Sequence, residues 1–431
     1  MNIGIDHINR NPKVIIGLGF AAVAVAILII PKFLNIVQTC GHFIQSDNIK
    51  LDYIIGLLWA FLLGCTILLW PVSPQDKKNL LIIWGVKVSV ALGLMLLYEN
   101  HYGLDSYGYF MWGKMSIDEI KALNLPKPNQ IVIAISWLHS HCFIRSYHAI
   151  KISFGMIGLA AIYIYYRAAV AFLKKEKPVL LYILALFPSL LFWSSILGKE
   201  PLVMLGMSLY SYGVVKWGRT GGWHYLLPLF GGLVFTSLIR VWLGAMMMIA
   251  MLPVGFSFRV KSIRMKTIFI VLLVVLFLIC AQLFVSHFGL GPDKKLADLA
   301  MEKVKDFAVG GSAGNVEALK FRNTWDMVCY VPAGMFTVLF RPLPGEVRNV
   351  FGFLAGLEGI VLVILFIVAM ARLRPKELID PLVIWVIILV TVWAVAYGFV
   401  GYNLGTTCRF RAQVLPIFLC LLLYQARAKD K

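Results

Sequence analysis

Charged residues are scarce in this chain of 431 residues: Asp, Glu, Lys and Arg make up 14%, whereas hydrophobic residues make up 60%. Soluble globular proteins carry about a quarter charged residues, so the side chains needed to cover a water-exposed surface are lacking. Apolar stretches long enough to cross a bilayer recur instead. The composition excludes an ordinary soluble enzyme and predicts an all-α integral membrane protein, with one polytopic domain over residues 1–431.

Paired cysteine motifs are also absent. The seven cysteines form no C-x-x-C pair, which excludes the common zinc and thioredoxin-type motifs. No A-x-A-like site follows the first apolar stretch, which predicts a retained span rather than a cleaved signal peptide. A disulfide is possible among the four cysteines near the predicted outer face, and the sequence does not indicate which of them would pair: Cys40, Cys142, Cys329 and Cys408.

Twelve apolar stretches are candidates for transmembrane helices. They cover about residues 13–30, 53–71, 80–98, 147–167, 178–196, 201–217, 224–239, 241–256, 266–286, 350–371, 381–402 and 411–426. The basic clusters fall in every second connector, as the positive-inside rule requires. This placement explains the net charge of +19 without a nucleic-acid partner. It predicts twelve spans, with both termini in the cytoplasm.

Two long segments then fall on the non-cytoplasmic side, at about residues 99–146 and 287–349. In the first, SIDEIKAL predicts a short helix that Ser116 and Glu119 cap reciprocally. In the second, residues 293–307 predict an amphipathic helix on the membrane surface. The following stretch, MVCYVPAGMFTVLF, is short and contains a proline, so we expect a re-entrant or interfacial element.

Several outer residues break the positive-inside pattern. Lys199 and Glu200 form the tip of a predicted outer hairpin, and Arg240 stands between two short apolar stretches. Further charged positions are Arg341, Arg409, Arg411 and Glu358. Ionisable residues at membrane depth are costly and usually face a cavity or a partner. Guanidinium and ammonium groups match phosphate oxygens, so we expect the lysine and the four arginines, together with Glu358, to bind an anionic, lipid-borne substrate.

Asp105 is the acid of an aromatic segment that includes Tyr107. A carboxylate can take the proton from an attacking hydroxyl, and positive charge can stabilise a departing phosphate. We therefore expect Asp105, with Glu200 as a second carboxylate, to be catalytic, and Tyr107 to stack on a sugar.

Plainer interpretations remain for each of these residues. Asp105 fits a solvated loop acid or a helix cap, and Glu200 fits the polar turn of a hairpin. The arginines fit side chains that reach lipid headgroups, and Glu358 fits a pair with Lys87 or another buried cation.

The histidines give little support to a metal site. His139, His141 and His148 have a spacing that matches no familiar ligand motif. The sequence therefore requires no cofactor, and a divalent metal has no support from the residues themselves.

Three patches resemble bacterial C-type membrane glycosyltransferases and polysaccharide polymerases. They are LDSYGYF to SIDEIKAL, FPSLLFWSSILGKEPL, and the pair VPAGMFTVLFRPLPGE and CRFRAQVLPIF. The resemblance implies transfer of a sugar or oligosaccharide from a polyprenyl-phosphate-linked donor in cell-surface polysaccharide biosynthesis, beside other assembly proteins. The mannosyltransferase type often has two adjacent acids, whereas Ser106 follows Asp105 here, which puts that branch's metal dependence in doubt.

Two other classes of protein compete with a transferase. A transporter or flippase of a lipid-linked oligosaccharide would have a similar hydropathy profile, but such proteins usually show paired halves, and no repeat is evident here. A structural subunit of an envelope complex would leave the outer arginines unexplained.

Overall fold

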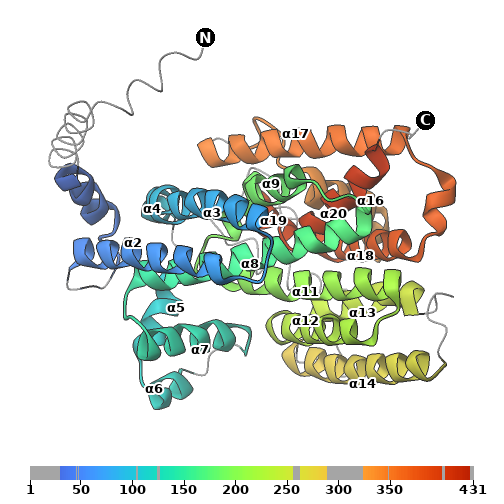
Figure 1. Cartoon of the computed structure of the whole chain (residues 1–431), viewed down its shortest axis with the longest axis horizontal. Helices are drawn as coiled ribbons and strands as arrows, with labels where there is room; N and C mark the ends of the chain where they lie inside the picture. Colours follow the sequence, from blue (N-terminus) through green and yellow to red (C-terminus); the bar gives the residue numbers. More distant parts are fainter. Residues whose placement is uncertain are drawn as a thin grey trace, which may run out of the picture.

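The computed structural model describes residues 30–44, 46, 48–102, 105–123, 127–255, 263–288, 324–347, 349–399 and 403–427. Every regular element among these residues is helical, which confirms the all-α class. The predicted first span (13–30) and the predicted surface helix (293–307) lie almost entirely or entirely outside the described residues. The long helices run roughly along one common direction (Figure 1).

The helices are numbered in chain order. Their bounds are α2 Ile49–Thr66, α3 Pro74–Ser89, α4 Met95–His101, α5 Asp105–Lys114, α6 Ile117–Ala122, α7 Lys127–Cys142, α8 Tyr147–Leu173, α9 Pro178–Leu186, α10 Pro188–Trp193, α11 Lys199–Thr220, α12 Leu226–Ile239, α13 Val241–Gly255, α14 Ile263–Phe288, α16 Thr324–Phe340, α17 Val350–Ala371, α18 Pro381–Gly398, α19 Leu404–Arg411 and α20 Leu415–Ala426. A π-helical segment, η3 Val90–Leu94, joins α3 to α4.

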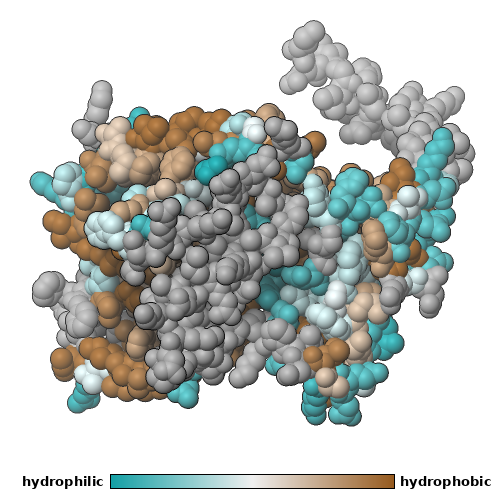
Figure 2. Space-filling model, turned by 180° about the vertical axis from the view of Figure 1, so that it is seen from behind, coloured by the Kyte–Doolittle hydropathy of each residue, from teal (hydrophilic) through white to brown (hydrophobic). Residues whose placement is uncertain are grey.

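The described residues contain five helices that are long and apolar enough to cross a membrane, and six if the bent pair α19–α20 counts as one. Apolar side chains on α17 and α14 lie exposed, including Phe353, Ile364 and Val271. Hydrophobic residues also cover much of the molecular surface in Figure 2. Since water would penalise such a surface, the chain is a multi-pass membrane protein. The number of twelve spans stays a prediction.

Two predicted spans are not continuous helices. The stretch 178–196 divides into α9 and α10 because Pro188 cannot donate to the preceding turn. The stretch 411–426 begins inside α19, which meets α20 at an angle of 71°. Both breaks lie beside charged residues, and irregular backbone at membrane depth is tolerated where protein surrounds it.

The first of the two long segments that the sequence places outside is mostly helical. Helices α5, α6 and α7 fill it and lie together at one end of the molecule (Figure 1). Ser116 and Glu119 form the predicted capping box at α6. In the second segment, α16 is one helix of 17 residues with Pro332 inside it. The helix continues through this proline, and its re-entrant or interfacial placement stays a prediction.

The six described cysteines are free thiols, so no disulfide joins any two of them. They are Cys40, Cys65, Cys142, Cys329, Cys408 and Cys420.

A turn over residues 194–198 links α10 to α11 and is held from two sides. The Lys87 ammonium of α3 donates to the carbonyl of Ser194 (3.0 Å) and to the hydroxyl of Ser195 (3.0 Å). On the opposite side Gly158 of α8 approaches so closely that a Cβ there would lie 2.0 Å from the Ser194 carbonyl oxygen. These contacts fix the point from which α11 starts.

Candidate functional site

Glu200 lies at the first turn of α11 and is 1% exposed. Its Oε1 accepts from Arg409 Nε at 2.6 Å and from Arg240 at 3.1 Å, and its Oε2 accepts from the second Arg409 donor at 3.1 Å. The Arg409 contact is a bidentate fork, the strongest arginine–carboxylate geometry. One buried carboxylate thus holds two arginines that lie 169 residues apart in sequence.

Arg240 occupies the break between α12 and α13. Its φ of −142° and ψ of 89° end the helix, and its backbone N–H donates to Thr236. The guanidinium lies over the Phe410 ring, 4.6 Å from the centroid. Among the described residues its buried Nε has no hydrogen-bond acceptor.

Asp105 reaches the same cluster from the opposite side. It begins α5, and its Oδ2 lies 3.5 Å from an Arg409 nitrogen. Its side chain is 61% exposed, whereas that of Glu200 is 1% exposed. The two carboxylates therefore differ: Glu200 is enclosed by arginines, and Asp105 is open to an incoming group.

Lys199 supplies a third cation. No described residue forms an ion pair with its ammonium, although Glu200 and Asp105 lie near enough to influence it. Burial, and then the charge of Arg240, lower the pKa of Lys199 to about 8. Burial would raise the pKa of Glu200, but Arg409 and Arg240 outweigh it and hold that pKa below its usual value.

Together these five residues, Asp105, Lys199, Glu200, Arg240 and Arg409, are named the Glu200 cluster. Three cations face two carboxylates, so one positive charge is in excess when all five are ionised. The cluster can therefore bind an anion beside an exposed carboxylate. Sequence reasoning expected these residues to share one compartment. The structure brings Asp105, Glu200, Arg240 and Arg409 into contact, and Lys199 directly precedes Glu200 in α11.

Arg411 and Glu358 form a separate pair. Arg411 donates to Glu358 Oε1 at 2.8 Å, and both side chains have 0% exposure. Ser189 donates to both Glu358 oxygens, through its hydroxyl (2.6 Å) and its N–H (2.7 Å). Arg411 also donates to the carbonyls of Leu339 and Arg341. The partner of Glu358 is thus Arg411 rather than Lys87.

Arg341 and Tyr107 lie apart from the Glu200 cluster. Arg341 donates to Glu346, with its Nε 2.8 Å from Oε1. Tyr107 is half-buried, and its ring stacks on that of Tyr147 with centroids 5.1 Å apart. The predicted roles of both residues in substrate binding stay predictions.

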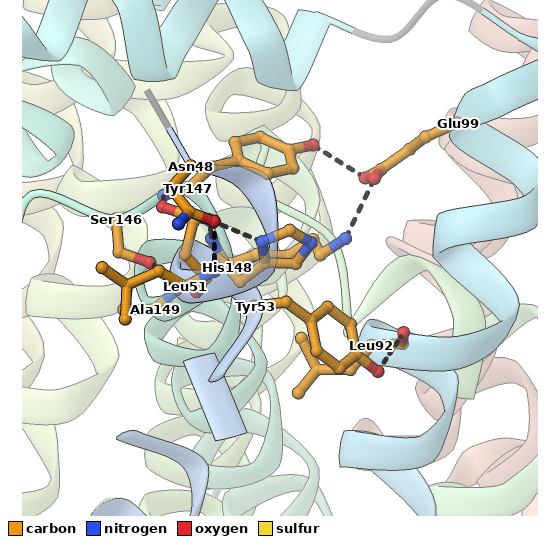
Figure 3. A network of polar contacts seen from close by, with 11 residues as sticks. Asn48, Leu51, Tyr53, Leu92, Glu99, Ser146, Tyr147, His148 and Ala149 are labelled. Carbon is orange, nitrogen blue, oxygen red and sulfur yellow. Dashed lines mark hydrogen bonds and ion pairs between the residues drawn. The ribbon is translucent and has the colours of Figure 1, made fainter. Parts of the chain in front are cut away.

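A second group of charges escaped sequence reasoning. It is named the Glu99 network and comprises Asp52, Glu99, Tyr147, His148 and Lys151. Figure 3 labels Glu99, Tyr147 and His148. Lys151 donates to Glu99 at 2.9 Å, with side-chain exposures of 0% and 1%. The Tyr147 hydroxyl donates to the other Glu99 oxygen at 2.8 Å, and Asp52 accepts from His148 Nδ1 at 2.5 Å.

The Glu99 network joins α2, α4 and α8 and reaches toward the Glu200 cluster. The hydroxyl of Ser106, the residue after Asp105, lies 3.0 Å from the Tyr147 hydroxyl. Lys151 could have indicated this network from the sequence, because it is a charged residue inside the predicted span 147–167 and such residues usually have a partner. The histidines do not share a site: His139 contacts Ser153, His141 the carbonyl of Trp137, and His148 contacts Asp52.

No protein-family model matches this chain, and no curated protein or solved structure matches it either. Its function is therefore inferred from the geometry and charge of the Glu200 cluster.

Proposed function

We propose that the chain is a membrane glycosyltransferase that transfers a sugar or oligosaccharide from a polyprenyl-phosphate-linked donor. The observation that carries this proposal is the contact between the exposed carboxylate of Asp105 and Arg409, within a cluster whose cations outnumber its acids. Transfer of a sugar from a lipid phosphate needs two kinds of group. A base takes the proton of the acceptor hydroxyl, and cations stabilise the negative charge on the leaving phosphate.

In the proposed reaction the acceptor hydroxyl attacks the anomeric carbon of the donor sugar. Asp105 takes the hydroxyl proton while the new carbon–oxygen bond forms. The bond between the anomeric carbon and the phosphate oxygen breaks, and its electron pair leaves with the polyprenyl phosphate. Arg409, Arg240 and Lys199 stabilise the negative charge on that phosphate. No oxidant or other co-reactant is required.

Glu200 is assigned a positioning role in this scheme. Both of its oxygens are occupied by arginine donors, so it holds Arg409 and Arg240 in place. Loss of Glu200 would leave two buried guanidinium groups without their common acceptor. Within the same proposal, the reaction belongs to cell-surface polysaccharide biosynthesis at the outer face of a bacterial inner membrane.

The proposal is tested with purified protein in lipid nanodiscs and a polyprenyl-phosphate-linked sugar. We expect release of polyprenyl phosphate in the presence of an acceptor glycan, measured by mass spectrometry. Asp105→Asn should reduce this release by about 10²–10⁴-fold, the contribution of a general base.

The matched control is Asp118→Asn, which alters an acid on α6 whose side chain is 95% exposed. It should release polyprenyl phosphate at the wild-type rate. Equal activity of Asp105→Asn and wild type would remove the proposed base. Movement of the intact donor between leaflets without release would instead identify a flippase.

A further inference from the structure

An apolar cavity of about 310 Å³ lies beside the Glu200 cluster. Its wall comes from η3 and α4, from α10, from the first turns of α17, and from α19. Five aromatic side chains contribute to the lining: Tyr98, Tyr102, Phe192, Trp193 and Phe351. Its volume falls at the lower end of the range of about 300–1,000 Å³ found for small-molecule sites.

Two residues connect this cavity to the cations. Trp193 lines it, and the Arg409 guanidinium lies 5.7 Å from the centroid of the Trp193 ring. Cys408 also lines the cavity and directly precedes Arg409 in α19. A ligand with an anionic end at Arg409 would therefore have its next atoms at the mouth of an apolar chamber.

Several polar side chains of the cavity wall already have hydrogen-bond partners. Glu358 and Ser189 contribute to the lining, but Ser189 and Arg411 donate to both oxygens of Glu358. Asn349 donates to the Tyr102 hydroxyl at 3.2 Å. These groups offer little to a polar ligand, so the cavity suits a hydrocarbon chain.

The helix opposite α17 is irregular at the cavity. Val90 and Leu94 line it, and they are the first and last residues of the π-helical segment η3. Single π-helical turns inside α-helices are rare and occur frequently at functional sites. Leu94 (38% exposed) and Leu354 (45% exposed) belong to both the lining and the apolar surface, which gives a route from the bilayer.

We propose that this cavity receives the part of the prenyl chain nearest to the phosphate of the donor lipid. The identity of that lipid rests on the proposed function. A single chain suits a cavity of this size, whereas a diacyl phospholipid carries two chains and a glycerol backbone. The cavity then acts as a specificity site, because it binds lipid phosphates through the chain and not only through the charge.

The test fills the cavity without touching the cations. Ala355→Phe places a ring inside it, and Leu357→Phe is the matched control on the lipid-facing side of α17. Binding of decaprenyl phosphate and of inorganic phosphate is measured by the quenching of tryptophan fluorescence in nanodiscs. Ala355→Phe should weaken binding of decaprenyl phosphate at least tenfold and leave binding of inorganic phosphate unchanged.

A second pair of variants distinguishes a specific loss of binding from a loss caused by misfolding. Leu94→Trp fills the cavity from the other wall, and Leu97→Trp is its exposed control outside the lining. Wild-type affinity for decaprenyl phosphate in either cavity variant, or equal losses in variant and control, would overturn the proposal. Equal competition by phosphatidylglycerol would also overturn it, since the site would then not select a prenyl chain.

The binding measurements distinguish an error in the cavity proposal from an error in the proposed function. If Arg409→Ala abolishes binding of both probes while Ala355→Phe changes neither, the cavity proposal is wrong and the phosphate site stands. If Ala355→Phe weakens decaprenyl phosphate but Arg409→Ala does not, the cavity proposal is supported and the assignment of the cations fails.

Discussion

The Glu200 cluster and the Glu99 network both gather charges at helix ends, but they satisfy them differently. In the Glu99 network, each described acid has one basic partner, Lys151 for Glu99 and His148 for Asp52, and the side chains are at most 5% exposed. In the Glu200 cluster, cations outnumber acids, and the Asp105 side chain is 61% exposed. Closed pairing suits a support between helices, whereas excess positive charge beside an opening suits a ligand.

The largest expected effect comes from breaking the closed pair. Lys151→Met leaves the Glu99 carboxylate buried with no cation, which should cost about 3–5 kcal/mol of stability. Thermal unfolding of the solubilised protein, followed by circular dichroism, measures this loss.

Two further variants sharpen this result. The double variant Glu99→Leu/Lys151→Met removes both charges and should regain most of the lost stability. Lys121→Met, in the exposed pair with Asp118, should leave the unfolding temperature unchanged. A wild-type unfolding temperature for Lys151→Met would show that the network is not a support.

In the Glu200 cluster a conservative change should lower the release of polyprenyl phosphate more than it lowers stability. Arg409→Lys keeps the charge but cannot form the fork to Glu200. We expect a loss of about 10–100-fold in release of polyprenyl phosphate, since hydrogen bonds to charged groups contribute about 1.5–3 kcal/mol each. The matched control is Arg219→Lys, which alters a pair with Asp380 near the opposite end of α11. Equal losses of polyprenyl phosphate release in both variants would show that the Glu200 cluster is not required for the reaction.

The contact between the Glu99 network and Ser106, beside the Glu200 cluster, can be removed without changing any charged residue. Tyr147→Phe removes the hydroxyl that contacts Glu99 and Ser106. We expect a loss of stability of about 1–1.5 kcal/mol, together with a lower kcat and an unchanged KM, because Ser106 adjoins Asp105. If kcat is also unchanged, the network supports the helices without setting the position of α5.

The smallest effect concerns pH. Because the pKa of Lys199 is lowered to about 8, its ammonium is charged below that pH and loses its proton above it. Affinity for decaprenyl phosphate should therefore fall a few-fold as pH rises from 7 to 9. Lys199→Arg should remove this dependence, since arginine stays protonated. An identical pH profile in this variant would assign the titration to another group.

Local patterns predicted local structure well. The capping box of Ser116 and Glu119 depends on residues three positions apart, and α6 begins where the sequence placed it. Pro188 already marked the break between α9 and α10, although the apolar stretch around it suggested one span.

Partnerships between distant residues could not be predicted in the same way. Outer charges that break the positive-inside pattern marked most of the Glu200 cluster, but no local spacing indicates that Glu200 binds Arg240 and Arg409. Asp52 and Glu99 escaped notice because each lies directly beside a predicted span, where charges are common. Their burial depends on how α2, α4 and α8 pack, and single-sequence patterns do not contain that information.

The close approach of Gly158 to Ser194 has an effect well beyond α8. A methyl group at position 158 would overlap the Ser194 carbonyl oxygen, and the turn anchored by Lys87 would have to move. Lys199 and Glu200 follow that turn within five residues, so Gly158→Ala would shift the arginines that Glu200 holds. A residue that can touch no substrate thereby sets where the substrate's phosphate would bind.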